Sequence, residues 1–393
     1  MWFFFACTPL PTDSAVEIDW LTAQKLSEMT HRLTDLGPRQ VATDAESLAA
    51  AVAEAMLLEG GLEDVERVPF VWDAWLPGEA TITLGGQTFS GEPLSPSPST
   101  TGLTGILTSG ATSGGIALFS SDDGSRAEQF VLALTSGADA MIRITEHRDE
   151  DGGPLIEVGH TLEGSSLPAV AVDAETGAAL KAAIGQTVTL DLTTTVVPDH
   201  TSENLVGWLE GSASSATVAL TAHYDSWHPS ESAADNAIGV AMAALLAADI
   251  AQTIPDRRLL VLLTSGEEQG LQGANRWVSD NAALAGSVNL VINLDIPWSD
   301  EGTLRCGCDN DSVMAEALAA LEEEGLSAED VGPPWPASDH LPFQTRGADA
   351  LWCTRQPYRR YHTEGDIVDI IDMEQAAAVM RAHAVVLRAA LTL

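Results

Sequence analysis

The stretch that decides the fold is residues 258–268, which read Arg258-Leu-Leu-Val-Leu-Leu-Thr-Ser-Gly-Glu-Glu268. Its first seven residues are almost continuously apolar, which is typical of a strand in the middle of a sheet that is covered on both faces. A serine, a glycine and two acidic residues follow directly. In open α/β sheets the functional side chains lie on loops just past the carboxyl ends of the strands. The stretch therefore predicts a buried central strand with a polar site at its end.

The segments around this stretch alternate between short apolar strands and helices. We expect further strands at 65–75, 204–209, 216–221, 289–294 and 350–353, and helices at 236–250, 275–281, 314–325 and 373–391. Helical periodicity over 15–59 ends at Gly60-Gly61, as helices commonly do at glycine. This alternation predicts an α/β fold, with a mostly parallel mixed sheet and helices on both faces.

A change of composition marks a second unit within the 393 residues, a length for which two domains are the natural expectation. From residue 76 the chain is rich in Gly, Ser, Thr and Pro, and short strands then alternate with helices expected at 125–136 and 173–184. We expect a small α/β module without catalytic residues, and interpret His147 and His160 as solvated. The predicted boundaries are 1–13 for a leader and tether, 14–75 and 196–393 for the catalytic domain, and 76–195 for the inserted module.

The charge balance excludes some partners. The chain has 57 acidic and 18 basic residues, a formal net charge of −39. Nucleic acids and anionic membranes are excluded as partners, because neutralising phosphates requires Lys and Arg. The acids are scattered along the chain, which indicates a strongly solvated surface. No apolar run reaches the ~18 residues typical of a membrane span, so none is expected.

The N-terminus resembles the end of a lipoprotein signal peptide, because a short apolar stretch runs to Ala6 and is followed by Cys7 and a polar tether. We therefore expect a secreted, periplasmic or cell-envelope-anchored protein with a lipid anchor at Cys7. A cytoplasmic location is the alternative. The other cysteines leave two readings open. Either Cys306 or Cys308 pairs with Cys353, or all three are free thiols.

Five residues that can bind a metal follow the predicted strands or precede a helix: His223, Asp235, Glu268, Asp295 and His362. Imidazole and carboxylate ligands suit zinc. Two histidines and three carboxylates exceed what one tetrahedral ion with an open water position needs, and they match two ions that share a bridging carboxylate. We expect two Zn²⁺ ions, with one ion as the alternative. The neighbouring Glu267 stays free to act as the base towards a bridging water.

Six motifs in the family's order resemble the co-catalytic di-zinc aminopeptidases. They are His223-Tyr-Asp-Ser, Ala234-Asp-Asn-Ala-Ile-Gly, Ser265-Gly-Glu-Glu-Gln-Gly-Leu-Gln-Gly, Asn293-Leu-Asp, Ser338-Asp-His-Leu-Pro-Phe and Tyr361-His-Thr. The resemblance covers about 15–70 and 200–393. The same family contains glutamate carboxypeptidases, plasma dipeptidases, glutaminyl cyclases and transferrin-receptor-like proteins.

The resemblance implies how the ligands divide between two ions. One zinc is expected on His223 and Asp295, the other on Glu268 and His362, with Asp235 bridging both.

It also implies the roles of the surrounding groups. Glu267 is expected to be the general base. Asp225 is expected to orient the imidazole of His223, and Tyr361 to help hold the oxyanion. Asp339 and His340 are expected near the site as support. The module at 76–195 resembles a protease-associated domain, on the segments 130–144 and 167–172, and such domains usually shape access to the cleft.

The resulting hypothesis is a zinc-dependent exopeptidase that removes N-terminal residues from peptide substrates. The alternatives are a carboxypeptidase or dipeptidase on the same scaffold and a single-zinc glutaminyl cyclase, which residues 338–351 also resemble. A non-catalytic binding protein is disfavoured because no ligand is lost. Serine and metalloprotease motifs of other classes, G-x-S-x-G and H-E-x-x-H, are absent from the sequence. Side-chain specificity and oligomeric state are not determined by the sequence.

Overall fold

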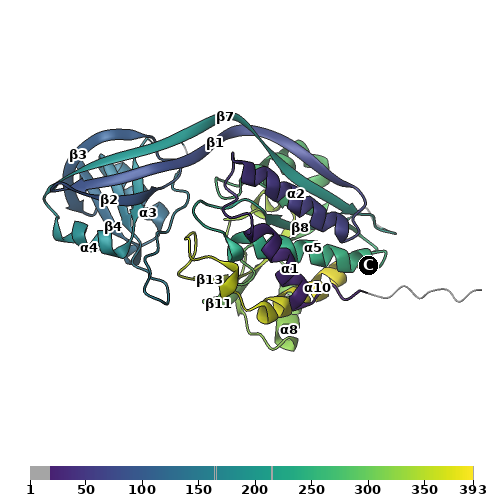
Figure 1. The fold of residues 1–393 in the computed structure, drawn as a ribbon. Coiled ribbons are helices and arrows are strands. Elements are labelled where there is room, and N and C mark those ends of the chain that lie inside the picture. Colours follow the sequence, from purple (N-terminus) through teal and green to yellow (C-terminus); the bar gives the residue numbers. More distant parts are fainter. Residues whose placement is uncertain (1–17, 163, 165, 214–215, 393) are drawn as a thin grey trace, which may run out of the picture.

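A long two-stranded ribbon joins the two lobes of the computed structural model, which describes residues 18–162, 164, 166–213 and 216–392 (Figure 1). The ribbon consists of β1 (Val65–Leu84) and β7 (Thr187–Leu209), which pair antiparallel with irregularities near Trp72 and Pro77. The segments 65–75 and 204–209, which were predicted to be strands, are therefore parts of two much longer strands. Backbone pairing between β1 and β7 carries both strands from one lobe to the other.

The larger lobe contains a mixed sheet whose central strands are parallel. Along the sheet the order is β7-β9-β8-β10-β13-β11-β12. The strands are β8 (Thr217–His223), β9 (Arg258–Thr264), β10 (Val288–Asn293), β11 (Thr303–Cys308), β12 (Glu329–Asp330) and β13 (Asp349–Gln356). β8, β9, β10 and β13 are parallel, whereas β7 and β11 run antiparallel to their inner neighbours. The predicted mostly parallel mixed sheet is confirmed.

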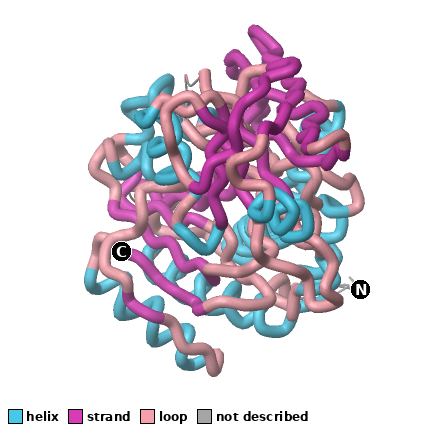
Figure 2. The backbone as a smooth tube through the Cα atoms, turned by 90° about the vertical axis from the view of Figure 1, so that its left-hand side faces the viewer, coloured by secondary structure: helices cyan, strands magenta, loops and turns pink. Residues whose placement is uncertain are grey.

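Helices cover both faces of this sheet, and Figure 2 shows helices on either side of the strands. On one face lie α1 (Ala23–Thr34), α2 (Asp44–Glu59), α5 (Ile238–Ala251), α8 (Asp311–Glu323) and α10 (Met373–Leu391). On the other lie α6 (Gln272–Asp280), α7 (Ala282–Ala285) and α9 (Leu341–Gln344). The central strand β9 shows why both are needed, since Leu259, Val261 and Leu263 enter the first core while Leu260 and Leu262 enter the second.

One helical segment, Ala233–Ala251, is long and apolar enough to cross a membrane by composition alone. Its apolar window is 94% buried inside the lobe, so packing in the core accounts for its composition.

The smaller lobe is a ring of strands closed through the ribbon, in the order β1-β2-β6-β5-β4-β3-β7. Its own strands are β2 (Gln87–Pro93), β3 (Thr100–Ser109), β4 (Gly115–Ser120), β5 (Ala140–Ile144) and β6 (Ala169–Val172). Two helices, α3 (Arg126–Ser136) and α4 (Ala174–Ala182), and the short turn η1 (Ser121–Asp123) complete it. β2 and β3 were not predicted, because they are polar and largely exposed and lack the apolar pattern of a buried strand.

A disulfide links β11 to β13 in the larger lobe. Cys306 and Cys353 lie directly opposite each other in the antiparallel pair and form an S–S bond, while Cys308 is a buried free thiol. This decides between the pairings that the sequence left open. Cys7 and its lipid anchor lie outside the described residues, so the anchor stays a prediction.

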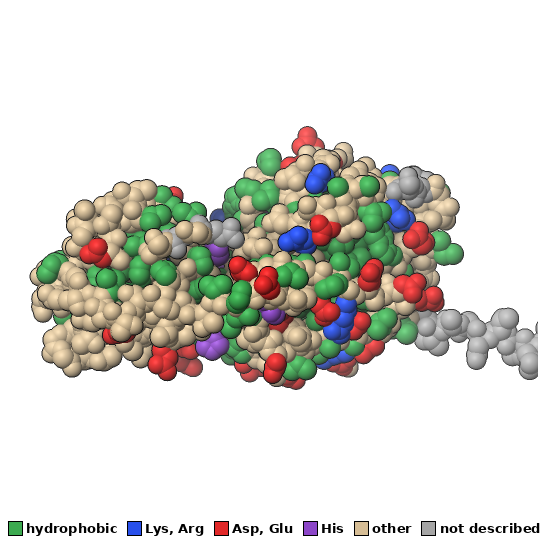
Figure 3. Space-filling view, turned by 90° about the horizontal axis from the view of Figure 1, so that it is seen from above, with side chains coloured by type: hydrophobic (Ala, Val, Ile, Leu, Met, Phe, Trp, Pro, Cys, Tyr) green, Lys and Arg blue, Asp and Glu red, His purple; other side chains and the backbone are tan. Residues whose placement is uncertain are grey.

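Acidic side chains are spread over the molecule in Figure 3 and do not gather in one patch on the face that it shows. This distribution agrees with the scattered acids of the sequence and with a solvated acidic surface.

The start of α5 packs tightly against the end of β10, and glycine is required there. A Cβ atom on Gly239 would lie 2.1 Å from Asn236 Oδ1 and 2.3 Å from the Leu294 carbonyl oxygen. We expect Gly239→Ala to lower the free energy of unfolding by about 1–3 kcal/mol, the usual cost of overpacking, as measured by urea denaturation. Gly153→Ala is the control, because its Cβ meets only the Asp149 Cβ at 3.9 Å. Equal stability of the two variants would contradict this account of the packing.

Candidate metal centre

Parallel register brings three of the candidate residues to one edge of the sheet. His223, the last residue of β8, is paired with Thr264, the last of β9, so the Glu267–Glu268 turn follows beside it. Thr221 of β8 is paired with Asn293 of β10, which places Asp295 on the next loop at the same edge. The polar residues after the apolar strands therefore converge, as the strand pattern predicts.

The other two candidates come from connections. Asp235 lies in η2 (Ala233–Ala237), the irregular turn that leads into α5. His362 lies on the loop between β13 and η3 (Val368–Ile370), with a left-handed backbone at φ 55°. All five predicted ligands are buried, with at most 7% of each residue exposed.

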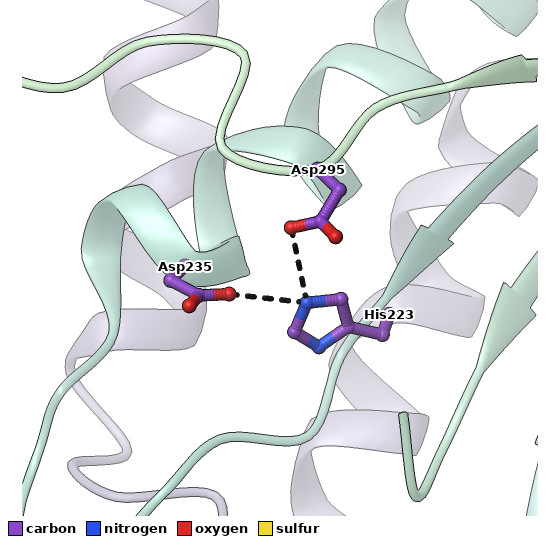
Figure 4. A group of neighbouring side chains, drawn as sticks. All are labelled: His223, Asp235 and Asp295. Atoms are coloured by element: carbon purple, nitrogen blue, oxygen red, sulfur yellow. Dashed lines mark ion pairs between the residues drawn. The ribbon is translucent and has the colours of Figure 1, made fainter. Parts of the chain in front are cut away.

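The first cluster surrounds the imidazole of His223 (Figure 4). Its Nε2 atom lies 3.1 Å from Asp235 Oδ1 and 3.4 Å from Asp295 Oδ1. The second carboxylate oxygen of Asp295 accepts a hydrogen bond of 2.5 Å from Ser338 Oγ, which orients the first towards the cluster.

The second cluster surrounds His362 and shares Asp235 with the first. His362 Nε2 lies 3.1 Å from Asp235 Oδ2 and 3.0 Å from Glu268 Oε2. One oxygen of Asp235 thus faces each imidazole, which is the arrangement of a bridging carboxylate. The structure brings together each ligand set that the family resemblance implies.

The donor atoms of both clusters fit zinc. His223 Nε2 and Glu268 Oε1 are buried without a hydrogen-bond partner, which is costly unless a metal satisfies them. Ligand atoms at ~2.0–2.1 Å from a tetrahedral zinc lie about 3.3 Å from one another. The distances of 3.0–3.4 Å within the clusters agree with that spacing. Nitrogen and carboxylate donors of this kind would hold zinc in both clusters.

Glu267 lies beside the clusters without belonging to either. Its Oε2 atom is 3.9 Å from His223 Nε2, and its side chain lines the same cavity as Asp235 and Asp295. Burial raises the pKa of Glu267 well above its usual range; His223 opposes this rise, and the carboxylates of Asp295 and Glu268 add to it. A carboxyl group that readily takes up a proton at this position suits a general base.

Asp225 contributes more to the Glu267–Glu268 turn than was expected. Its fully buried carboxylate accepts hydrogen bonds from the backbone N–H groups of Glu267, at 3.2 Å, and Glu268, at 3.4 Å. Towards His223, the Nδ1 atom lies 3.2 Å from the Asp225 carbonyl oxygen and 3.6 Å from its carboxylate. Asp225 therefore contacts both the imidazole that it was predicted to orient and the turn that carries the predicted base.

The remaining predicted residues lie around the clusters. The ring of Tyr361 stacks on the imidazole of His362, with centroids 3.7 Å apart, and lines the cavity. Asp339 accepts a hydrogen bond from Thr264, and burial raises its pKa to about 7. His340 Nε2 lies 2.8 Å from the Trp335 carbonyl oxygen. Neither Asp339 nor His340 joins a metal cluster.

Two buried residues that sequence reasoning missed hold the backbone around the bridging carboxylate. Asp366 accepts hydrogen bonds from the N–H groups of Ala234 and Asp235, at 2.8 and 3.1 Å. Arg39 donates to the carbonyl oxygens of Tyr224 and Ser232, at 2.9 and 3.0 Å, across the loop between the ligands His223 and Asp235. Neither lies next to a strand end in the sequence, so no local signal marked them.

Two cavities open onto the clusters. The first, of about 190 Å³, is lined by carboxylates and by Ile296, Trp335, Trp352, Gln356 and Tyr361. The second, of about 320 Å³, is bounded by Glu267, Glu268 and His362 on one side and by Arg126 and His160 of the smaller lobe on the other. His160, interpreted from the sequence as a solvated residue, thus lies beside the site.

A buried set of two histidines and three carboxylates at the carboxyl edge of such a sheet fits a co-catalytic two-metal centre, of the kind that aminopeptidases use. Residues 204–387 match the model of peptidase family M28, in agreement with the family that the sequence motifs resemble. This match supports the interpretation of this part of the chain as a metallopeptidase.

Individual relatives agree with this assignment. The chain is 28% identical to aminopeptidase YwaD of Bacillus subtilis over 284 residues, which are 67% of this chain and 59% of that protein. Among solved structures, BSAP, a zinc aminopeptidase from Bacillus subtilis, matches with a TM-score of 0.77 at 23% identity, over 95% of this chain and 96% of that one. An aminopeptidase from Aneurinibacillus sp. strain AM-1 matches with a TM-score of 0.71 at 23% identity, over 95% and 94%. These structural likenesses confirm the fold.

Replacing Asp366 tests whether its carboxylate supports the turn around Asp235. In Asp366→Asn an amide N–H₂ would face a backbone N–H group in a buried place, which leaves donors unsatisfied. We expect the free energy of unfolding to fall by about 1–3 kcal/mol in denaturant titrations. Asp369→Asn, an exposed change three residues further on, is the control and should leave stability unchanged. A stable Asp366→Asn variant would show that the turn does not need this carboxylate.

Proposed function

We propose that the protein is a zinc-dependent aminopeptidase, which hydrolyses the peptide bond after the N-terminal residue of a peptide. One observation carries the proposal: two buried His–carboxylate clusters share Asp235, and Glu267 lies free beside them. Similarity to an aminopeptidase supports the same activity.

The residues have distinct roles in this proposal. His223 and Asp295 would hold one zinc ion, Glu268 and His362 the other, and Asp235 both. When bound, zinc supplies Lewis acidity that lowers the pKa of a water molecule and polarises the substrate carbonyl.

The proton transfers would fall to Glu267. It accepts a proton from the attacking water and returns it to the leaving amine, so the same carboxyl group serves as base and then as acid. Its raised pKa supports this double role. Tyr361, which lies against the cavity, would donate a hydrogen bond from its hydroxyl group to the developing oxyanion.

The cavity of about 190 Å³ favours the amino end of a peptide over the carboxyl end. Recognition of a terminal carboxylate commonly uses Arg or Lys. The described residues that line this cavity include four carboxylates, Asp235, Glu267, Glu268 and Asp295, but neither Arg nor Lys. Bound zinc would balance these carboxylates, so the preference rests on the missing cationic side chain, because a terminal carboxylate would find no Arg or Lys to pair with among these residues.

The wall of the same cavity supports a preference for an apolar first residue. Ile296, Trp335 and Trp352 line it, and the two indole rings lie edge to face with centroids 6.1 Å apart. An apolar side chain would bury its surface against these groups, whereas an acidic one would lose hydration without gaining a cationic partner.

The smaller lobe and the location of the protein complete the proposal. We propose that residues 76–195 form a protease-associated domain which limits access to the site, since Arg126 and His160 border the second cavity.

Export of the protein is supported by the Cys306–Cys353 disulfide, because such bonds persist in oxidising compartments.

Glu267→Gln tests the catalytic role, because an amide cannot accept the proton. We expect kcat on aminoacyl-nitroanilides to fall about 10²–10⁴-fold, the usual contribution of a positioned base, with zinc content unchanged. Glu322→Gln, an exposed change on α8, should keep full activity. N-acetylated substrates should not be cleaved by any of the proteins. Activity of Glu267→Gln equal to that of the wild type, or preferential cleavage of the blocked substrates, would refute the aminopeptidase proposal.

Metal analysis of the purified protein tests the two-zinc centre. We expect two zinc ions per chain in the wild type and one in both His223→Ala and His362→Ala, since each histidine serves a separate cluster. His147→Ala, at an exposed site in the smaller lobe, should keep two. One zinc per wild-type chain, together with ammonia release from peptides with N-terminal Gln, would instead favour the glutaminyl cyclase.

A further inference from the structure

The metal ligand His362 has its second ring nitrogen directed at the smaller lobe. His362 Nδ1 lies 3.3 Å from the carbonyl oxygen of Val158, which is 204 residues away in sequence. The N–H group of Val158 in turn donates to the carbonyl oxygen of His362, at 3.0 Å. Because a carbonyl oxygen can only accept, the proton of the imidazole must lie on Nδ1 for this hydrogen bond to form. Nε2 is then left to face Asp235 and Glu268 as a metal ligand.

The two histidines of the site differ in which lobe supplies the hydrogen-bond acceptor for Nδ1. His223 finds its Nδ1 acceptor at Asp225, two residues further along its own loop, so the larger lobe suffices to orient it. His362 takes its acceptor from the connection between β5 and β6, which belongs to the smaller lobe. Ligating histidines generally need such an acceptor to fix their tautomer and ring orientation.

Arg126, at the start of α3, holds the Val158 carbonyl in place. Its guanidinium donates to the carbonyl oxygens of Val158, at 2.6 Å, and His160, at 3.0 Å. It also pairs with Glu157 at 2.8 Å, and Arg143 binds the other oxygen of that carboxylate at the same distance. Two guanidinium groups thus anchor the short segment that reaches the site.

The Val158 side chain fixes the same segment from the apolar side. It is 2% exposed and packs in a small cluster with Trp75 of the ribbon and Trp227 of the larger lobe. The ring of Trp227 lies edge to face with the imidazole of His362, with centroids 6.1 Å apart. The smaller lobe therefore packs directly around this ligand.

Gly159 allows this close approach. Its φ of +134° is one that residues with a side chain rarely adopt. A Cβ atom there would lie 2.3 Å from Arg126 Nη2 and 2.7 Å from His362 Nδ1. Only glycine leaves room for the imidazole and the guanidinium together.

We propose that the smaller lobe completes the second zinc site, with Val158 and Arg126 as positioning residues that fix the tautomer and orientation of His362. This inference rests on the proposed two-zinc function and deepens it, because it gives the smaller lobe a role in metal binding besides controlling access. Disturbing the segment 157–160 should weaken zinc at the His362 cluster and leave zinc at the His223 cluster unchanged.

Zinc titrations of the full-length metal-free protein against a competing chelator test the proposal. His362→Ala identifies which of the two binding steps belongs to the second cluster. In Gly159→Ala and in Arg126→Met we expect the zinc dissociation constant of that step to rise at least tenfold, the usual effect of losing such a partner. The other step should stay within twofold of the wild type. Circular dichroism and thermal unfolding of each variant show whether the fold is retained.

Gly124→Ala is the matched control, since Gly124 lies in the same lobe with a φ of +144° and its Cβ would meet nothing closer than 3.6 Å. Gly124→Ala introduces a similar backbone strain without touching the site. The zinc dissociation constants of both binding steps should therefore stay unchanged. The proposal is overturned if Gly159→Ala and Arg126→Met bind both ions as the wild type does, or if Gly124→Ala weakens the second step as much as they do. A wild type that binds two zinc ions but cleaves no peptide would refute the proposed activity and leave this inference standing.

Discussion

The carboxylate of Asp235 must face two imidazoles at once, and much of the larger lobe serves that requirement. Its two oxygens lie at the same distance, 3.1 Å, from His223 and His362. A side chain as short as that of Asp can do this only if the backbone around it is held, because it has few rotatable bonds with which to correct the position of its carboxylate. Asp366 binds the N–H groups before and at this residue, and Asn236 donates to the Leu294 carbonyl oxygen at 2.7 Å. The turn before α5 is therefore tied both to the loop of His362 and to the strand that leads to Asp295.

Burial makes this group of carboxylates energetically costly. Burial of these carboxylates, to which their mutual repulsion adds, raises the pKa of Glu267 well above its usual range and that of Glu268 to about 7, although the neighbouring histidines oppose the rise. Such a cluster is unfavourable by itself, and bound cations would offset the cost. Nearby, Arg39 is fully buried, and its hydrogen bonds go to backbone carbonyl oxygens of the loop between the ligands.

The ribbon of β1 and β7 extends the same sheet into the smaller lobe and keeps that lobe beside the site (Figure 1). A second link between the lobes is the buried guanidinium of Arg360, which pairs with Asp149 of the smaller lobe and Asp300 of the larger one. Because this residue is close to His362 in sequence, the lobe contact and the second metal cluster share one loop. The contacts that place the smaller lobe therefore also affect the geometry of the metal ligands.

The sequence by itself determined the fold class and the candidate ligands. The apolar run 258–264 requires burial on both faces, and polar residues that follow parallel strands must meet at one edge, so His223, Glu268 and Asp295 could be placed together from pattern alone. Only the tertiary structure decided the continuous ribbon, the pairing of Cys306 with Cys353, and the supports provided by Asp366, Arg39 and Val158. These depend on contacts between segments far apart in the chain, often through backbone groups that every residue carries. Such groups leave no mark in a sequence, because what distinguishes them is their position in space.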